Sequence, residues 1–249
     1  MPIKISVITA SYNNIATISD AYNSLREQTY SDIERIWIDG ASSDGTKELL
    51  ESLYNSNNGI FISEPDKGIY NALNKGIKLA TGDIVGFLHA DDIFNDKYCI
   101  ERIAKIFSDP EVQAVYGDLV YVKKDSPSEV VRRWKSKKFY RSLLKSGWMP
   151  PHPTLYIRRE IYQNLGGFDE NYKISSDYDF ILKLFLIPNL KIIYLPTTLV
   201  KMRVGGTSNR SILNIFNKSR EDFQAIKSNN VGGIRTLILK NISKFHQFW

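Results

Sequence analysis

The sequence predicts an α/β fold in which a mostly parallel central sheet carries helices on both of its faces. In the N-terminal half, short apolar runs alternate with segments whose apolar residues recur every three or four positions, as strands and helices do in α/β proteins. Polar, turn-rich loops follow the apolar runs, which is typical of the ligand edge of an open α/β sheet. The chain has 249 residues, of which 43% are hydrophobic, so it can bury one sizeable core.

The elements of the N-terminal half follow one another as strand and helix. Strands are expected at 3–9, 33–38, 60–63 and 84–88, and helices at 15–25, 49–53, 69–79 and 98–107. Because every acidic loop follows a strand of a parallel sheet, these loops should lie along the same edge.

The alternation weakens in the C-terminal half. Two paired strands are expected at 114–116 and 119–122, and a mobile basic loop at 123–150 because this stretch has no clear apolar period. A strand at 154–158, helices near 160–165 and 176–185, and a strand at 191–195 follow. We expect one domain over 1–210, divided after residue 122, and a helical appendage over 211–249.

The net charge of +6 is unevenly distributed. Residues 123–145 and 201–249 each carry a formal charge of +7, and the remainder carries −8. An acidic body suits cation binding, and basic extensions suit an anionic partner. A solvated charged surface is the alternative explanation for each basic stretch. Nucleic acid is not indicated as a partner, because aromatic residues are not interleaved as a stacking platform.

The sequence favours a cytoplasmic setting. Cys99 is the only cysteine, so neither a disulfide framework nor a cysteine-built zinc site is expected. The first residues lead directly into the first strand without a signal-peptide pattern. No apolar stretch approaches the roughly 20 residues of a membrane-spanning helix.

Two adjacent carboxylates, Asp91 and Asp92, follow an apolar strand directly. Such a pair can hold a hard divalent cation, which would neutralise a departing diphosphate. The alternative is that the pair caps a following helix.

Several short segments, taken in order, resemble glycosyltransferase family 2, whose members have the GT-A fold. They are VITASYN at 7–13, DGASSDGT at 39–46, EPDKG at 64–68, ADD at 90–92, GGFD at 166–169 and SDYD at 176–179. No single segment is specific, and their joint order and spacing carry the resemblance.

The resemblance implies a site for a nucleotide-diphosphate sugar, with a UDP-sugar favoured. Donor binding would fall to the residues Thr9, Tyr12, Asn13, Asp39, Asp66 and Asp91. A carboxylate can accept hydrogen bonds from a base, and a Tyr ring can stack on it; the alternative for Asp39 is that it only fixes its loop. The positive charge of Lys67 suits the phosphates. An Arg-Asn pair common in relatives reads Leu73-Asn74 here, so one donor contact of those relatives is missing.

The resemblance also implies the catalytic roles. Asp92 would coordinate Mg²⁺ or Mn²⁺, and Asp177 would be the general base of an inverting displacement, although Ser176 replaces the Glu that relatives carry before it. His152, between prolines, is expected either to contact the acceptor or phosphates or to be a turn residue. Arg203 begins a loop, 203–208, that resembles one closing over the diphosphate in relatives, and its charge suits phosphate.

The C-terminal segment mixes basic and large apolar residues. Residues Ile234, Leu237, Ile238, Ile242 and Phe245 share a helical face, which suits an interfacial helix on an anionic membrane. Packing against the catalytic domain or a partner chain is the alternative. We expect the acceptor to be a glycan, carried on a lipid, in bacterial surface-polysaccharide assembly.

Other classes of protein fit less well. A dinucleotide-dependent dehydrogenase would need a Gly-rich turn after the first strand, and residues 9–13 contain no glycine. A sugar nucleotidyltransferase and a noncatalytic nucleotide-sugar-binding module remain as alternatives.

Overall fold

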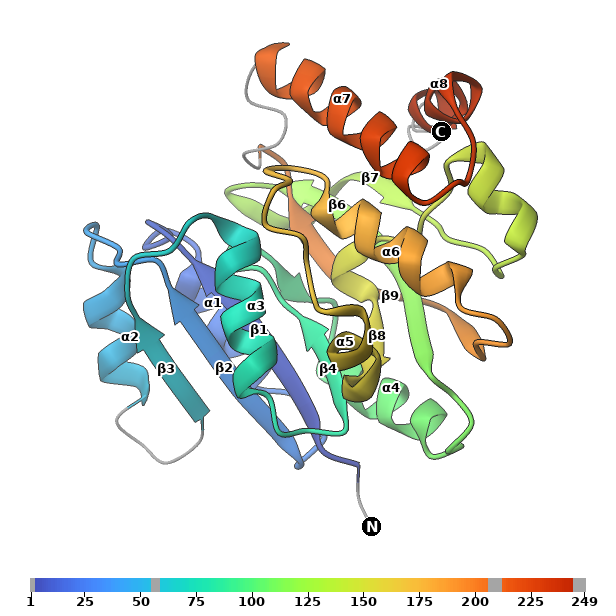
Figure 1. Ribbon diagram of the computed structural model, residues 1–249. Coiled ribbons are helices and arrows are strands. Elements are labelled where there is room, and N and C mark those ends of the chain that lie inside the picture. The colour runs from blue at the N-terminus through green and yellow to red at the C-terminus, as the bar shows by residue number, and fades with distance from the viewer. Residues whose placement is uncertain (1–2, 55–58, 206–211, 244–249) are drawn as a thin grey trace.

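A computed structural model describes residues 3–54, 59–205 and 212–243. Within these residues nine strands form one sheet, with β3-β2-β1-β4-β8-β6-β9-β5 as the spatial order and β7 paired with β6 (Figure 1). The strands are β1 (Ile5–Ser11), β2 (Ile33–Asp39), β3 (Gly59–Ser63), β4 (Ile84–Phe87), β5 (Ile93–Phe94), β6 (Ala114–Lys123), β7 (Ser126–Trp134), β8 (Tyr156–Arg158) and β9 (Ile192–Arg203).

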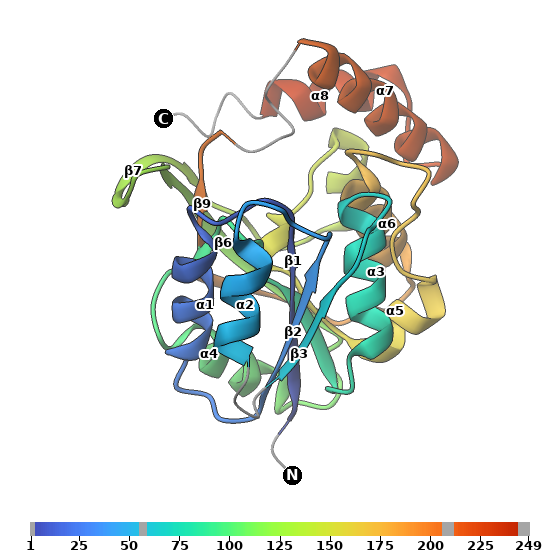
Figure 2. The same cartoon turned by 90° about the vertical axis from the view of Figure 1, so that its left-hand side faces the viewer.

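Helices cover both faces of the sheet, as the sequence predicts. They are α1 (Ile18–Arg26), α2 (Thr46–Tyr54), α3 (Ile69–Leu79), α4 (Cys99–Phe107), α5 (Arg159–Leu165), α6 (Ser176–Leu186), α7 (Ile212–Ser228) and α8 (Ile234–Ser243), with short 3₁₀ helices η1 (Arg141–Ser146) and η2 (His152–Thr154). Figure 2 shows α1, α2 and α4 on one face and α3, α5 and α6 on the other. Each face has its own hydrophobic core.

The central strand β1 explains this two-sided burial. All of its residues are buried. Ile5 and Val7 pack in one core, while Ile8 and Ala10 pack in the other, because successive side chains of a strand point to opposite faces. β1 pairs in parallel with both β2 and β4, and β2 pairs in parallel with β3. The loops that follow these four strands therefore emerge at one edge of the sheet.

The structure corrects the expectations for residues 114–150. Residues 114–123 form one strand, β6, rather than a pair of strands, and much of the expected loop is structured as β7 and η1. β7 pairs antiparallel with β6, and most of its side chains are exposed or half-buried. Backbone hydrogen bonds to β6 hold β7 in place. The strand can therefore form without an apolar period in its sequence.

The C-terminal helices α7 and α8 lie side by side at the end of the molecule opposite the N-terminus (Figures 1 and 2). α7 packs on α6, and α8 packs on α7 and η1. Leu237, which the sequence places on the predicted membrane face, packs instead against the core, and Phe245 lies outside the described residues. No described helix is long and apolar enough to span a membrane.

Candidate functional site

The carboxyl ends of β1, β2 and β3 meet at Asp39. In the strand register Asp39 stands beside Ser11 on one side and Ser63 on the other. Its fully buried carboxylate accepts hydrogen bonds from the hydroxyls of Ser11, Ser42 and Ser63, at 3.1, 2.5 and 2.7 Å, and from the Ser42 backbone N–H at 2.9 Å. Asp39 therefore ties three loops together, which supports the alternative that it fixes its loop.

Tyr12 and Asp66 both approach Gly40. A Cβ atom at position 40 would stand 2.6 Å from Asp66 Oδ2 and 3.2 Å from Tyr12 Cδ2, so a larger residue there would displace the Asp66 carboxylate. The Tyr12 side chain is 64% exposed, and Asp66 is half-buried beside the exposed Lys67. An accessible ring next to a carboxylate can stack on a nucleobase and accept its N–H groups.

Thr9 and Asn13 differ in what they offer a ligand. Thr9 is fully buried in β1, and its hydroxyl has no hydrogen-bond partner among the described residues. Asn13, in the left-handed region at φ 53°, accepts from the Ser43 N–H at 3.0 Å and donates its own N–H to Ser42 Oγ at 2.9 Å. Asn13 therefore joins the loops after β1 and β2.

The Asp91–Asp92 turn follows β4. It does not cap a helix, because β5 comes next and α4 begins only at Cys99. Asp92 is fully buried; its Oδ1 accepts the Arg203 N–H at 3.3 Å, and its Oδ2 has no partner among the described residues. Burial, and then the negative charge of Asp91, raise the pKa of Asp92 well above its usual value.

These features fit a divalent cation. A bound cation would place a positive charge next to the buried Asp92 carboxylate and so stabilise its ionised form. No cluster of three or more His, Cys, Asp or Glu side chains suited to a metal occurs in the described part of the chain. Magnesium at phosphate-handling sites needs only one or two carboxylates, since phosphate and water complete its shell. The small number of carboxylates in the Asp91–Asp92 turn is therefore compatible with such a cation.

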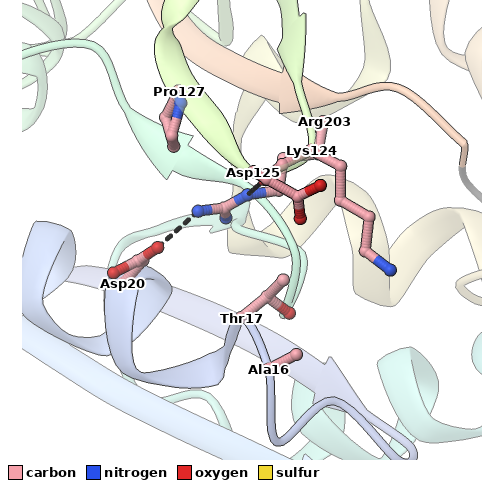
Figure 3. Close-up of a pocket in the computed structure, with 7 residues that line it drawn as sticks. All are labelled: Ala16, Thr17, Asp20, Lys124, Asp125, Pro127 and Arg203. Atoms are coloured by element: carbon pink, nitrogen blue, oxygen red, sulfur yellow. Dashed lines mark hydrogen bonds and ion pairs between the residues drawn. The ribbon is translucent and has the colours of Figure 1, made fainter.

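Arg203 contacts the Asp91–Asp92 turn. Its guanidinium pairs with Asp20 of α1 and donates to the backbone carbonyls of Asp91 at 2.9 Å and Lys124 at 3.0 Å. Figure 3 shows the side chain extending toward Asp20, with Lys124 and Asp125 beside it. Because Arg203 is only 4% exposed and bound to protein groups, the expected phosphate contact would require it to exchange these partners. Residues 206–208 of its loop lie outside the described residues.

Asp177 lies in the first turn of α6 and lines a cavity of about 750 Å³. The Tyr70 hydroxyl, from α3, is 3.2 Å from its Oδ1. His89, His152 and Arg203 line the same cavity, whereas Asp39, Asp92 and the other predicted donor residues do not. The structure therefore brings Asp177, His152 and Arg203 together and leaves the nucleoside residues in a separate group, against the expectation of a single site.

His89 connects the two groups. It precedes Asp91 in the chain and lines the cavity of Asp177. Burial lowers the pKa of His89, while the charges of Asp91 and Asp177 both act to raise it. Both carboxylates are thus close enough to His89 to influence its ionisation.

His152 belongs to an aromatic cluster. Its ring stacks on Phe87, with centroids 5.4 Å apart, and meets Phe168 edge-on at 5.6 Å. Burial lowers the pKa of His152 to about 4, so the imidazole is neutral at neutral pH. A neutral ring lining the cavity can hydrogen-bond to an acceptor but brings no positive charge to a phosphate.

Glu221 of α7 is a site residue that the sequence did not indicate. Its 7% exposed carboxylate accepts three backbone N–H groups, from Lys173 at 3.1 Å, Ile174 at 2.8 Å and Ser175 at 2.9 Å. These residues immediately precede α6, so Glu221 fixes the start of the helix that presents Asp177. No local motif signals the contact, because the partners are 46 to 48 residues apart.

A known protein family and curated proteins share the sequence pattern of this chain. The model of glycosyl transferase family 2 matches residues 6–166, which is more than half of the chain. A PGL/p-HBAD biosynthesis glycosyltransferase of Mycobacterium tuberculosis is 29% identical over 210 residues, covering 82% of this chain and 78% of that protein. An uncharacterized glycosyltransferase of Nostoc sp. is 29% identical over 216 residues, covering 83% and 66%.

Solved structures share the fold. TarS residues 1–349 of S. aureus, in complex with UDP-GlcNAc, superpose with a TM-score of 0.69 at 19% identity, covering 90% of this chain and 66% of that one. A mannosyltransferase of Pyrobaculum calidifontis, in complex with GDP-Man and Mn²⁺, gives 0.67 at 20%, covering 96% and 69%. The chain spans only 40% of a longer TarS structure.

The fold is thus the GT-A fold predicted from the sequence. The chain belongs to glycosyl transferase family 2.

The buried imidazole of His152 makes the free energy of unfolding depend on pH. Because the pKa of His152 is lower in the folded state than its ordinary value of 6.5, the stabilisation from a neutral ring is present above pH 6.5 and is lost as the pH falls toward 4. His152→Phe should remove this loss, since Phe suits the aromatic cluster. Denaturant unfolding across this pH range measures it, and an unchanged pH slope in the variant would contradict the assignment.

Removing the Glu221 carboxylate should disturb both the fold and catalysis. Glu221→Ala leaves three backbone N–H groups without an acceptor, at a cost of about 1–3 kcal/mol for each one that stays buried, and should lower kcat with little change in donor KM. Glu221→Gln keeps an acceptor oxygen and should be intermediate. Gln224→Ala, on an exposed position of α7, is the control. A normal kcat in the folded Ala variant would exclude a positioning role.

Proposed function

We propose that this protein is an inverting, metal-dependent glycosyltransferase that moves a sugar from a nucleotide-diphosphate donor to a hydroxyl of an acceptor glycan. One observation carries the proposal: the buried Asp92 carboxylate has an oxygen without a partner among the described residues, the Asp92 N–H donates to the His89 carbonyl at 3.0 Å, and His89 lines the cavity of Asp177. This arrangement separates a cation-binding carboxylate from one that can accept a proton.

In the proposed reaction Asp177 is the general base. It accepts the proton of the acceptor hydroxyl while that oxygen bonds to the anomeric carbon of the sugar. The bond from this carbon to the diphosphate breaks, its electron pair leaves with the nucleoside diphosphate, and the configuration at the carbon inverts. Mg²⁺ or Mn²⁺ held by Asp92 would stabilise the negative charge of the leaving group.

The donor site we propose begins at Tyr12 and Asp66. Their accessible ring and carboxylate are the parts of the nucleoside-side loops best placed to meet a base, while Thr9, Asn13 and Asp39 shape the loops beneath. Lys67 and Asp91 would face phosphates and ribose. We favour a UDP-sugar, and the support from the structural relatives is that one is in complex with UDP-GlcNAc and another with GDP-Man and Mn²⁺.

The acceptor site we propose is the cavity of Asp177 and His152. Its wall carries the basic residues Lys173, Lys218 and Arg220, which suit an acceptor glycan attached to a lipid through phosphate. Such an acceptor belongs to polysaccharide biosynthesis at the inner face of the cell membrane. Peripheral contact with an anionic membrane is therefore part of the proposal, as is a division into a nucleotide-sugar half, 1–122, and an acceptor half, 123–210.

Release of nucleoside diphosphate from a panel of nucleotide sugars, with and without Mn²⁺, tests the activity. We expect metal-dependent release from one donor class when a glycan acceptor is present, and NMR of the product should show an inverted anomeric configuration. No release from any donor, or retention of configuration, would contradict the proposal. Donor binding without release would instead indicate a noncatalytic nucleotide-sugar-binding module.

Asp177→Asn should lower the rate of sugar transfer by on the order of a hundredfold or more. Thermal stabilisation by UDP and Mn²⁺ should stay as in the wild type. The substitution removes the base without altering the donor loops. Asp179→Asn is the matched control, because Asp179 is on the same helix but pairs with Lys183 and Asn229. Full activity of Asp177→Asn would overturn the base assignment.

Asp92→Asn should remove the metal dependence of donor binding. The amide keeps the shape of the side chain but loses the charge that attracts the cation. Melting temperatures with UDP alone and with UDP and Mn²⁺ should become equal in the variant. An undiminished Mn²⁺ effect would show that the cation binds elsewhere.

A further inference from the structure

The two C-terminal helices turn polar side chains toward the protein. On α7, Glu221 and Asp222 are 7% and 1% exposed, and on α8 Thr236 and Lys240 are 4% and 3% exposed. Lys240 Nζ lies 2.6 Å from Asp222 Oδ1 and 3.2 Å from the ring centroid of Tyr178, next to Asp177 in α6. Removing one partner from a buried ion pair is strongly destabilising, so these contacts define which faces of α7 and α8 point inward.

Large apolar side chains are nevertheless exposed on both helices, and on α8 they lie on the face opposite Thr236 and Lys240. The exposed set comprises Ile215 and Phe216 on α7, and Ile234, Ile238, Leu239 and Ile242 on α8. Ile234, Ile238 and Ile242 are spaced by four residues and share one face of α8. A surface helix normally buries its apolar side chains. α7 does so with Ala225 and Ile226, and α8 packs Leu237 against the core, but the face of α8 that carries the three Ile residues stays exposed. Contact with another apolar phase would remove this face from water.

The exposed charged side chains of α7 and α8 are all basic. Lys227 and Arg235 are exposed, whereas Glu221 and Asp222, the only acidic residues of α7 and α8, are both buried. Apolar side chains interspersed with cations, and without exposed carboxylates, match the interface of an anionic bilayer. A partner protein surface of mixed charge would not require this bias.

We infer that α7 and α8 form a docking surface for an anionic lipid bilayer, with Ile215, Phe216, Ile234, Ile238, Leu239 and Ile242 entering the headgroup boundary. The inference rests on the proposed function, because it names the surface that brings the enzyme to a lipid-linked acceptor. The inner side of α7 contributes Asn217 and Lys218 to the cavity of Asp177. α7 thus belongs both to the proposed docking surface and to the lining of the proposed acceptor cavity.

Co-sedimentation of the full chain with vesicles of phosphatidylcholine, alone or mixed with phosphatidylglycerol, tests the inference. The wild type should bind the mixed vesicles, and added salt should weaken binding. The variant Ile238→Asp/Ile242→Asp should lose on the order of tenfold or more in partition coefficient. The control Gln163→Asp/Asn164→Asp adds the same two charges at exposed positions of α5 and should bind as the wild type does.

Other results would overturn the inference. They are the absence of wild-type binding to mixed vesicles, equal binding by the Ile238→Asp/Ile242→Asp variant, or a wild-type dimer that this variant converts to a monomer without any vesicle binding. Thermal stabilisation by UDP and Mn²⁺, measured on the same samples, reports on the proposed function separately. Vesicle binding without nucleotide stabilisation would refute the transferase and leave the docking surface standing.

Discussion

Parallel pairing of β1 with β2 and β4, and of β2 with β3, is the constraint on which the site depends. Parallel strands end at the same edge, so loops that are far apart in sequence become neighbours there. Residues 12, 66 and 91 follow such strand ends, and residue 39 is the last residue of β2. Both faces of β1 are buried in hydrophobic cores, and a one-residue slip of its register would exchange the two sets of side chains. The register is thus held by the same apolar residues that stabilise the fold.

The position of Asp177, the proposed general base, depends on a second, longer-range constraint. Asp177 is in the first turn of α6, and the segment before α6 is held by Glu221 from α7, while Tyr70 from α3 contacts Asp177. The family model ends at residue 166, before any of the C-terminal helices. α7 is therefore more than an appendage, because it supports α6 and lines the cavity in which we propose that the acceptor binds.

The sequence predicted the parts of this architecture that local patterns encode. Alternating apolar periods identified the strands and helices of the N-terminal half, and the family segments identified the fold. Contacts between distant segments could not be predicted in the same way. β7 is held by pairing with β6 rather than by apolar burial, Arg203 by Asp20 and two backbone carbonyls, and Glu221 by backbone N–H groups. None of these partners leaves a periodic or motif signal in the chain.

The central claim is that Asp92 and Asp177 act on one substrate complex although they do not line the same cavity. A crystal structure with UDP and Mn²⁺, with manganese located by its anomalous signal, tests it most directly. The account predicts a manganese peak at the Asp92 carboxylate and a diphosphate between that ion and the cavity of Asp177. Manganese bound away from Asp92, or a nucleotide whose phosphates point away from Asp177, would contradict it.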